Sequence, residues 1–368
     1  MTRAVKKRFY GIGKTFTLNE KSYFCHDEKT IRIISKALCM STIFQHIKHY
    51  GLLFCLAVLL TTSCRHPEAM SCDDYRQAMR DFVVRISETA RIQKPDFIVI
   101  PQNGIELVTL GNDAHADIAA AYLAAIDGHG QEDLFYGYRR DDEPTPSDAT
   151  EYLLSYLRRS KQTGKSILVT DYCSRQEYVA GSHQQCDAEG FLSFAAPSRE
   201  LDLIPVSAPP HENAQNILRL NNSQNFLYLL NNEHFNNKNA FIEAVSNTNY
   251  DVIVMDLFFK DSTAFTSAEV ERLKQKANGG KRLVICYMSI GEAENYRYYW
   301  QSSWKLHKPV WLARENPSWP GNFKVRYWVP EWQNIICGAG ESYLNRILNA
   351  GFDGVYLDIV DAFEYFER

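Results

Sequence analysis

Apolar runs that alternate with helical stretches organise the chain from residue 74 onward. A helical stretch covers Asp74–Arg91, and Thr150–Arg159 and Ser267–Ala277 carry apolar residues at helical spacing with charged residues between them. This alternation predicts βαβ units around a parallel sheet. The predicted strands are continuous apolar runs, as expected of strands buried on both faces: Phe97–Pro101, Leu134–Tyr138, Ile167–Asp171, Phe191–Ala195, Phe226–Leu230, Val252–Leu257, Leu283–Met288, Val325–Trp328 and Val355–Ile359.

The number of predicted strands fits a TIM (β/α)8 barrel with one strand to spare. Such a barrel holds eight strands, so one of the nine runs must be accessory. We assign this place to Phe191–Ala195. Residues 74–368 are then expected to form a single α/β domain, which is a suitable length for one barrel.

Polar residues stand at or just beyond the carboxyl end of nearly every predicted strand. In a TIM barrel this end carries the active site, so together these side chains predict a carboxylate-rich pocket. Each of them alone can equally be a helix cap or a surface charge. The set comprises Gln102, Asn103, Glu132, Asp133, Asp171, Asp256, Glu292, Asp358 and Asp361.

A second pattern lies near the start of the chain. An apolar run over residues 51–60 follows His46, Lys48 and His49, and ends in Thr-Thr-Ser before Cys64. A basic stretch, a short apolar stretch and small residues are typical of a secretory signal, and the run is too short to span a bilayer. We expect a lipoprotein signal over 40–63, lipidation of Cys64, a tether over 64–73, and an over-extended reading frame over 1–39. A plain signal peptide or a buried helix is the alternative.

Composition limits the kinds of partner and cofactor that we expect. The net charge is −4, which provides no electrostatic footprint for nucleic acid. The nine cysteines include no C-x-x-C pair, and only a Cys173–Cys186 disulfide is considered. Neither H-x-H nor HExxH spacing occurs, so a zinc site is not indicated. We expect an exported monomer without a cofactor, anchored to a membrane by lipid, in the periplasm or at the cell surface.

Longer motifs resemble one enzyme family. The segments Tyr287–Glu294 (YMSIGEAE), Trp319–Asn322 (WPGN) and Gly351–Asp358 (GFDGVYLD) resemble those of glycoside hydrolase family 114, the endo-α-1,4-polygalactosaminidase relatives. The motifs Pro101–Gly104 (PQNG), Gly130–Tyr136 (GQEDLFY) and Leu168–Tyr172 (LVTDY) resemble the part that follows them in the family, yet here they come first.

The resemblance therefore implies a circularly permuted barrel. A closed barrel brings its first and last strands together, so its old ends can be joined and the ring opened elsewhere. Residues 205–224, rich in Pro, Asn and Ser, are the expected joining loop. A fusion of two truncated gene copies is the alternative, but each family block occurs once.

The resemblance also implies chemistry. It points to a retaining hydrolase with Asp358 as nucleophile and Glu132 as acid/base, acting on an α-1,4-linked galactosamine polymer. Other residues are expected to bind the substrate. The residues expected to pair with its ammonium groups are Asp256, Glu292, Asp361 and Asp171. The residues expected to stack on sugar faces are Tyr287, Tyr356 and Trp328, and those expected to hydrogen-bond hydroxyl groups are Gln102 and Asn103.

Three other functions remain open from the sequence. Clustered carboxylates also bind Mg²⁺ or Ca²⁺, as in a metal-dependent hydrolase. A surface lipoprotein can keep such a barrel for carbohydrate binding without catalysis. The third is a structural relic of a broken gene.

Overall fold

The computed structural model describes Cys72 and residues 74–367. The predicted signal, Cys64 and the region 1–39 lie outside the described residues, as does most of the tether. Within the described part of the chain, no helix has the length and apolarity that crossing a membrane requires.

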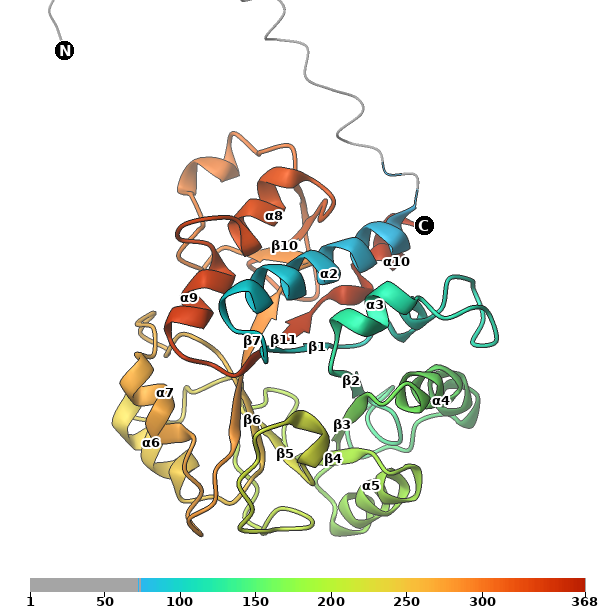
Figure 1. Ribbon diagram of the computed structural model, residues 1–368, viewed down its shortest axis with the longest axis vertical. Coiled ribbons are helices and arrows are strands. Elements are labelled where there is room, and N and C mark those ends of the chain that lie inside the picture. Colours follow the sequence, from blue (N-terminus) through green and yellow to red (C-terminus); the bar gives the residue numbers. More distant parts are fainter. Residues whose placement is uncertain (1–71, 73, 368) are drawn as a thin grey trace, which may run out of the picture. The chain divides into compact units, whose positions relative to one another are not determined.

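Parallel strands form two sheets (Figure 1). The five-stranded sheet has the order β1-β11-β7-β6-β5, and the three-stranded sheet has the order β2-β3-β4. Every neighbouring pair within them is parallel. The strands are β1 (Ile98–Pro101), β2 (Gly128–Glu132), β3 (Ser166–Tyr172), β4 (Leu192–Ala196), β5 (Phe226–Tyr228), β6 (Val252–Met255), β7 (Leu283–Ser289) and β11 (Gly354–Asp358).

The two sheets meet at two places. Beside β1, Asp127 N donates to Val99 O (2.9 Å) and Asn103 N donates to Gly130 O (2.9 Å). The rings of Phe194 in β4 and Phe226 in β5 lie 5.7 Å apart. Strands that are distant in the sequence are thereby brought side by side, since β1 lies between β11 and β2.

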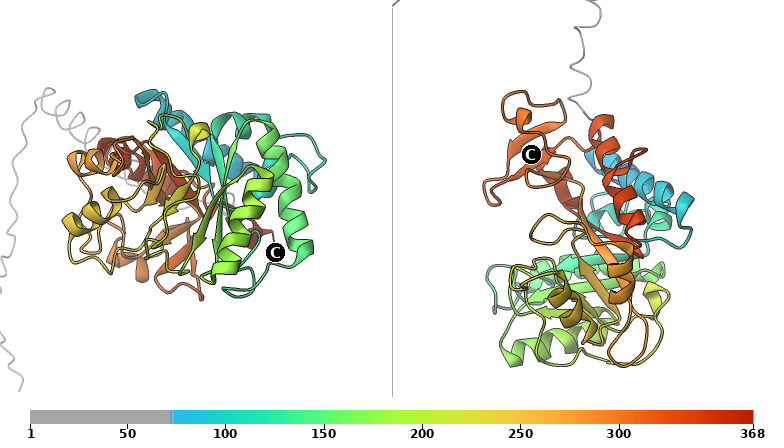
Figure 2. Two further views of the ribbon diagram at one scale, coloured as in Figure 1. Left: turned by 90° about the horizontal axis from the view of Figure 1, so that it is seen from below. Right: turned by 90° about the vertical axis from the view of Figure 1, so that its left-hand side faces the viewer.

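Helices cover these strands. Figure 2 shows α4 and α5 (green) lying along the strands of the smaller sheet, and α2 runs past α8, α9 and α10 in Figure 1. Asp74 caps α2 by accepting a hydrogen bond from Gln77 N, and Thr266 and Glu269 form a capping box at α7. The helices are α2 (Tyr75–Gln93), α3 (Ala120–Ala125), α4 (Ser147–Gln162), α5 (Gln176–Glu189), α6 (Lys238–Ser246), α7 (Ser267–Leu273), α8 (Pro330–Cys337), α9 (Tyr343–Asn349) and α10 (Phe363–Phe366), with 3-10 turns at Ile105–Val108, Leu220–Asn222, Ser302–Lys305 and Val360–Ala362.

A small antiparallel sheet follows β7. It has the order β8-β10-β9, from β8 (Glu292–Glu294), β9 (Leu312–Glu315) and β10 (Asn322–Val325). The insertion carries Glu292 and Glu294 beside the carboxyl end of β7, so it belongs to the surroundings of the predicted site.

Three strand predictions are wrong. The strand expected over Leu134–Tyr138 lies earlier, at β2, whose glycine and polar residues produce no apolar run. Phe191–Ala195 is not accessory, because β4 pairs with β3 over its whole length. Val325–Trp328 is not a parallel strand: only Val325 is in a strand, and that strand is antiparallel. The remaining runs and the helices at Asp74–Arg91 and Thr150–Arg159 are confirmed to within a few residues, while the helix predicted over Ser267–Ala277 ends at Leu273.

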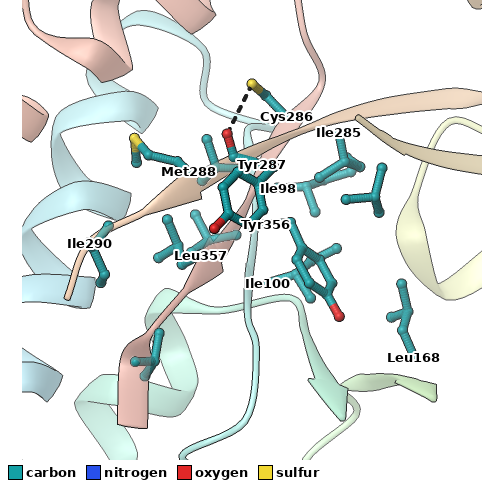
Figure 3. Close-up of a cluster of buried hydrophobic side chains, with 14 of the residues drawn as sticks. Ile98, Ile100, Leu168, Ile285, Cys286, Tyr287, Met288, Ile290, Tyr356 and Leu357 are labelled. Carbon is teal, nitrogen blue, oxygen red and sulfur yellow. Dashed lines mark hydrogen bonds between the residues drawn. The ribbon is translucent and has the colours of Figure 1, made fainter. Parts of the chain in front are cut away.

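Buried aliphatic and aromatic side chains fill the space between strands and helices. Figure 3 shows Tyr287 and Tyr356 at the centre of one such cluster, with Ile98, Ile100 and Leu168 around them. The packing explains why residue 130 is a glycine. A Cβ atom at this position would lie 1.9 Å from the Tyr356 hydroxyl. Such tight interiors leave no room for an added methyl group.

The expected joining loop contains neither helix nor strand over 205–219. It is nevertheless anchored, because Asn213 donates to the Asp251 carboxylate (3.1 Å) and Lys276 Nζ binds the same carboxylate at 2.9 Å. Lys276 and Asp251 are fully buried. Breaking such a pair typically costs 3–5 kcal/mol. The disulfide considered between Cys173 and Cys186 is absent, since both are free buried thiols.

Candidate functional site

Glu132 ends β2 and accepts hydrogen bonds from two neighbouring strands. Gln102 Nε2 lies 2.7 Å and Asn103 Nδ2 lies 3.0 Å from its Oε2 atom, both from the end of β1. On the other side the Tyr172 hydroxyl, at the end of β3, donates to Oε1. These donors fix the carboxylate and stabilise its negative charge.

Asp358 ends β11, on the other side of β1. The Tyr287 hydroxyl in β7 donates to its Oδ2 atom at 2.7 Å. Burial, and next the negative charge of Glu132, raise the pKa of Asp358 to about 7. A raised pKa on one of two neighbouring carboxyl groups is typical of sites that use such groups for acid and base chemistry.

Two buried tyrosines lie near the pair. The Tyr228 hydroxyl donates to Gln102 Oε1 at 3.2 Å, and its ring lies 5.1 Å from that of Tyr356. Burial and the charges of both Glu132 and Asp358 raise the pKa of each hydroxyl. The buried Tyr356 hydroxyl has no hydrogen-bond partner among the described residues, so it is available as a donor.

The backbone is unusual at three strand ends of this site. Asn103, Asp133 and Ile359 have φ angles of 57°, 58° and 57°. This left-handed conformation costs about 1–3 kcal/mol for a residue other than glycine, and most for a β-branched one such as isoleucine. Two of the three directly follow Glu132 and Asp358, so the strain coincides with the carboxylates.

Asp361 lies one turn beyond Asp358. It lines a cavity of about 310 Å³ together with Lys324 and Glu364. Burial, and next the charge of Glu364, raise the pKa of Asp361 to about 7. The charge of Glu132 acts in the same direction, which places Asp361 near the pair.

Asp256 and Glu292 are already paired within the protein. Arg297 Nη1 binds Asp256 Oδ2 at 2.7 Å, and both side chains are largely buried. Glu292 is 1 % exposed and binds Lys324 Nζ at 2.7 Å and Asn316 Nδ2 at 2.8 Å. A substrate ammonium would have to compete with these internal cations.

Four of the predicted site residues are packed inside the protein, where their side chains or rings contact other parts of the fold. Asp171 is fully buried and accepts from Phe135 N (2.9 Å) and Ser182 Oγ (2.7 Å). Trp328 packs against α2 and α10, with the ring of Phe366 at 4.8 Å. The aromatic rings of Tyr287 and Tyr356 are buried in the core, so their hydroxyls, rather than their faces, serve the site.

The sequence reading missed Tyr172, Tyr228 and Arg199. The Arg199 guanidinium lies 3.8 Å from the centre of the Tyr172 ring and binds Asp133 Oδ1 at 3.0 Å. The only sequence signal is a tyrosine at or near a strand end, which an apolar pattern counts as core. Arg199 follows β4, the strand assigned wrongly as accessory.

Metal ligands do not gather in the described part of the chain: no group of three or more His, Cys, Asp and Glu side chains is placed to hold an ion there. His129 is buried in β2, with Nδ1 2.9 Å from Ser160 Oγ. Burial lowers the pKa of His129 to about 3, so it is a neutral core residue.

Comparison with known proteins identifies the second half of the fold. Residues 207–368 match the model of glycoside-hydrolase family GH114. This part of the chain is similar to family GH114. The GH114 segment contains β5, β6, β7 and β11 with Asp358, whereas Glu132 lies in the preceding part. A mixed α/β fold with parallel sheets is consistent with this similarity.

Curated relatives match part of the chain. The chain is 43 % identical over 157 residues to an uncharacterized protein of Methanocaldococcus jannaschii, covering 42 % of this chain and 41 % of that protein. It is 43 % identical over 123 residues (33 % and 37 %) to one of Deinococcus radiodurans, and 38 % identical over 144 residues (39 % and 41 %) to one of Thermotoga maritima. The chain thus spans about two fifths of the length of these relatives.

Proposed function

We propose that the protein is a retaining glycoside hydrolase that cleaves an α-1,4-linked galactosamine-type polysaccharide. One observation carries the proposal: Glu132 and Asp358 end strands on either side of β1 and share one buried, tyrosine-lined environment. The GH114 segment supports the reaction class, and the resemblance noted above supplies the substrate class.

The proposed chemistry uses both carboxyl groups. Asp358 attacks the anomeric carbon while Glu132 donates its proton to the leaving glycosidic oxygen, forming a glycosyl ester. Glu132 then removes a proton from water, which attacks the anomeric carbon and releases Asp358 as carboxylate. Tyr287 holds Asp358, and Gln102, Asn103 and Tyr172 hold Glu132.

In the unliganded molecule Asp358 holds a proton more tightly than an ordinary carboxyl group. Burial, and next the charge of Glu132, raise its pKa to about 7, while Glu132 accepts three side-chain hydrogen bonds. The proposed role of nucleophile requires Asp358 to be ionised during the reaction. A cationic galactosamine unit beside Asp358 would lower its pKa, so substrate binding would favour the ionised nucleophile.

We further propose that the two sheets form one circularly permuted barrel. The β1–β2 hydrogen bonds, the Phe194–Phe226 contact and a family match confined to 207–368 support this. The ends are also close, because Arg76 Nε binds Glu367 Oε1 at 2.9 Å. A chain that links residue 367 to residue 74 and opens within 205–219 is expected to fold and retain activity; an unfolded product from several linkers would contradict permutation.

Export and lipid anchoring are proposed from the sequence alone. Cys64 would carry the lipid, with the signal over 40–63 removed. In a bacterial host, incorporation of labelled fatty acid by the full chain and its loss in Cys64→Ser would support this. Labelling that persists in Cys64→Ser would contradict it.

The direct test is hydrolysis of de-N-acetylated α-1,4-galactosamine oligomers by purified residues 65–368. The wild type is expected to cleave them with retention of the anomeric configuration, and Asp358→Asn and Glu132→Gln to lose cleavage. A product of inverted configuration would overturn the proposed roles. Full activity in either variant would overturn the site.

A further inference from the structure

A second cavity, of about 350 Å³, lies at the carboxyl ends of β5 and β6. Its walls come from the loops after these strands, including Asn231 and Phe258, and from Tyr296 and Tyr298 after β8. Tyr296 is 57 % exposed. An amphipathic ring, side-chain amides and a recess of this size suit a small polar ligand with an apolar face.

Asp256 and Arg297 line this cavity and belong, with the adjacent Glu294, to one charged group. Arg297 binds Asp256 at 2.7 Å and Glu294 at 2.5 Å, and all three side chains are almost fully buried. One guanidinium is shared by two carboxyl groups, and burial raises the pKa of Asp256 against the opposing charge of Arg297. The group therefore lacks one cation. At the rim, Glu233 and Lys260 bring opposite charges that offset each other.

An unbalanced buried charge is costly unless a partner compensates for it. Tyr296 disperses part of it, because its hydroxyl donates to Glu294 Oε1 at 2.7 Å. An ammonium group entering the cavity would compensate for the rest and could also contact the tyrosine face, an interaction typically worth 0.5–2 kcal/mol. The chemistry of the cavity therefore favours a cationic sugar over a neutral one.

The position of the cavity separates it from the scissile bond. Asp256 directly follows β6, and β7 lies between β6 and β11, in register through Cys286. Two strand spacings amount to about 10 Å. The cavity and the Asp358 end of β11 therefore share one edge of the sheet, at a distance that a neighbouring unit of a polymer would span.

We propose that this cavity binds a cationic amino-sugar unit of the polysaccharide away from the cleavage point, with Tyr296 as its contact surface and the Asp256–Arg297–Glu294 group as its charged floor. The inference rests on the proposed function, since the occupant is part of the same substrate. It predicts that long oligomers bind through contacts that short substrates never reach.

The experiment compares long galactosamine oligomers with an aryl α-galactosaminide, which occupies only the cleavage point. Tyr296→Ala is expected to raise KM for the oligomer roughly 3- to 10-fold, with kcat/KM for the aryl substrate unchanged. Tyr152→Ala, which removes a tyrosine of similar exposure on the outer helix α4, is the matched control and should change neither. Equal oligomer KM values for wild type and Tyr296→Ala would overturn the inference.

Calorimetry on the Asp358→Asn background separates this inference from the proposed function. Binding of the long oligomer should weaken in Tyr296→Ala and in Glu294→Gln, which removes the excess charge, even if no glycan tested is cleaved. Binding that is equally strong in the correctly folded Tyr296→Ala variant overturns the cavity assignment. A catalytically inert wild type that still shows the Tyr296 dependence refutes the proposed function alone.

Discussion

The first four parallel strands and the last four each carry one carboxylate of the proposed pair, and they hold it differently. In residues 74–206, Glu132 is held by three side-chain donors from its own part of the chain. In the GH114 segment, Asp358 has one side-chain donor and a raised pKa. Each half therefore provides only one carboxylate of the proposed pair. The hydrogen bond from Tyr228 to Gln102 connects the two halves.

The largest expected effect separates the two carboxyl groups. On an aryl galactosaminide whose leaving group needs no proton, Glu132→Gln should keep most of its glycosylation rate, whereas Asp358→Asn should lose on the order of 10²–10⁴-fold or more. Pre-steady-state release of the aryl group measures this. The reverse pattern would exchange the two roles.

The next largest effect is expected on stability, where Lys276 and Asp251 anchor the expected joining loop. Lys276→Met should leave Asp251 buried without its cation and lower the free energy of unfolding by about 3–5 kcal/mol. The exposed Lys281→Met should change it by less than about 0.5 kcal/mol. Urea denaturation monitored by tryptophan fluorescence provides both values, and equal effects would show that the anchor is unimportant.

A smaller effect is expected where the first half holds its carboxylate. Tyr172→Phe removes a hydrogen bond to a charged group, worth about 1.5–3 kcal/mol, so kcat/KM should fall about 10-fold or somewhat more. Arg199→Lys keeps the positive charge but loses the flat contact of the guanidinium with the Tyr172 ring. In this variant kcat/KM should fall by a smaller factor. Unchanged kcat/KM in both variants would remove Tyr172 from the site.

The last prediction concerns pH. The pKa of Asp358 in the fold is about 7, above its unfolded value of about 3.9. The folded state thus binds the proton more tightly, and stability should fall as pH rises from about 4 to about 7. Asp358→Asn should flatten this fall and be the more stable protein at pH 7, as measured by thermal unfolding. A parallel pH profile would contradict the assigned burial.

The sequence predicted strands where burial coincides with apolar side chains, and failed where it does not. The strand β2 was missed because Gly130 makes room for Tyr356 and His129 is buried as a neutral ring. The apolar run at Val325 was predicted as a parallel strand but belongs to an antiparallel insertion. Such an insertion buries aromatic side chains as a barrel strand does, so the two patterns look alike. Of the site, Glu132 and Asp358 came from motifs, but the surroundings of Asp171 and Tyr172 depend on contacts between strands.

The most direct test of a site shared by both parts of the chain is to trap the glycosyl intermediate. Glu132→Gln is incubated with an activated galactosaminide, and the intact protein and its peptides are weighed by mass spectrometry. The account predicts one added sugar, located on Asp358, and none in the Glu132→Gln/Asp358→Asn double variant. An adduct on another residue, or an adduct that survives in the double variant, would contradict it.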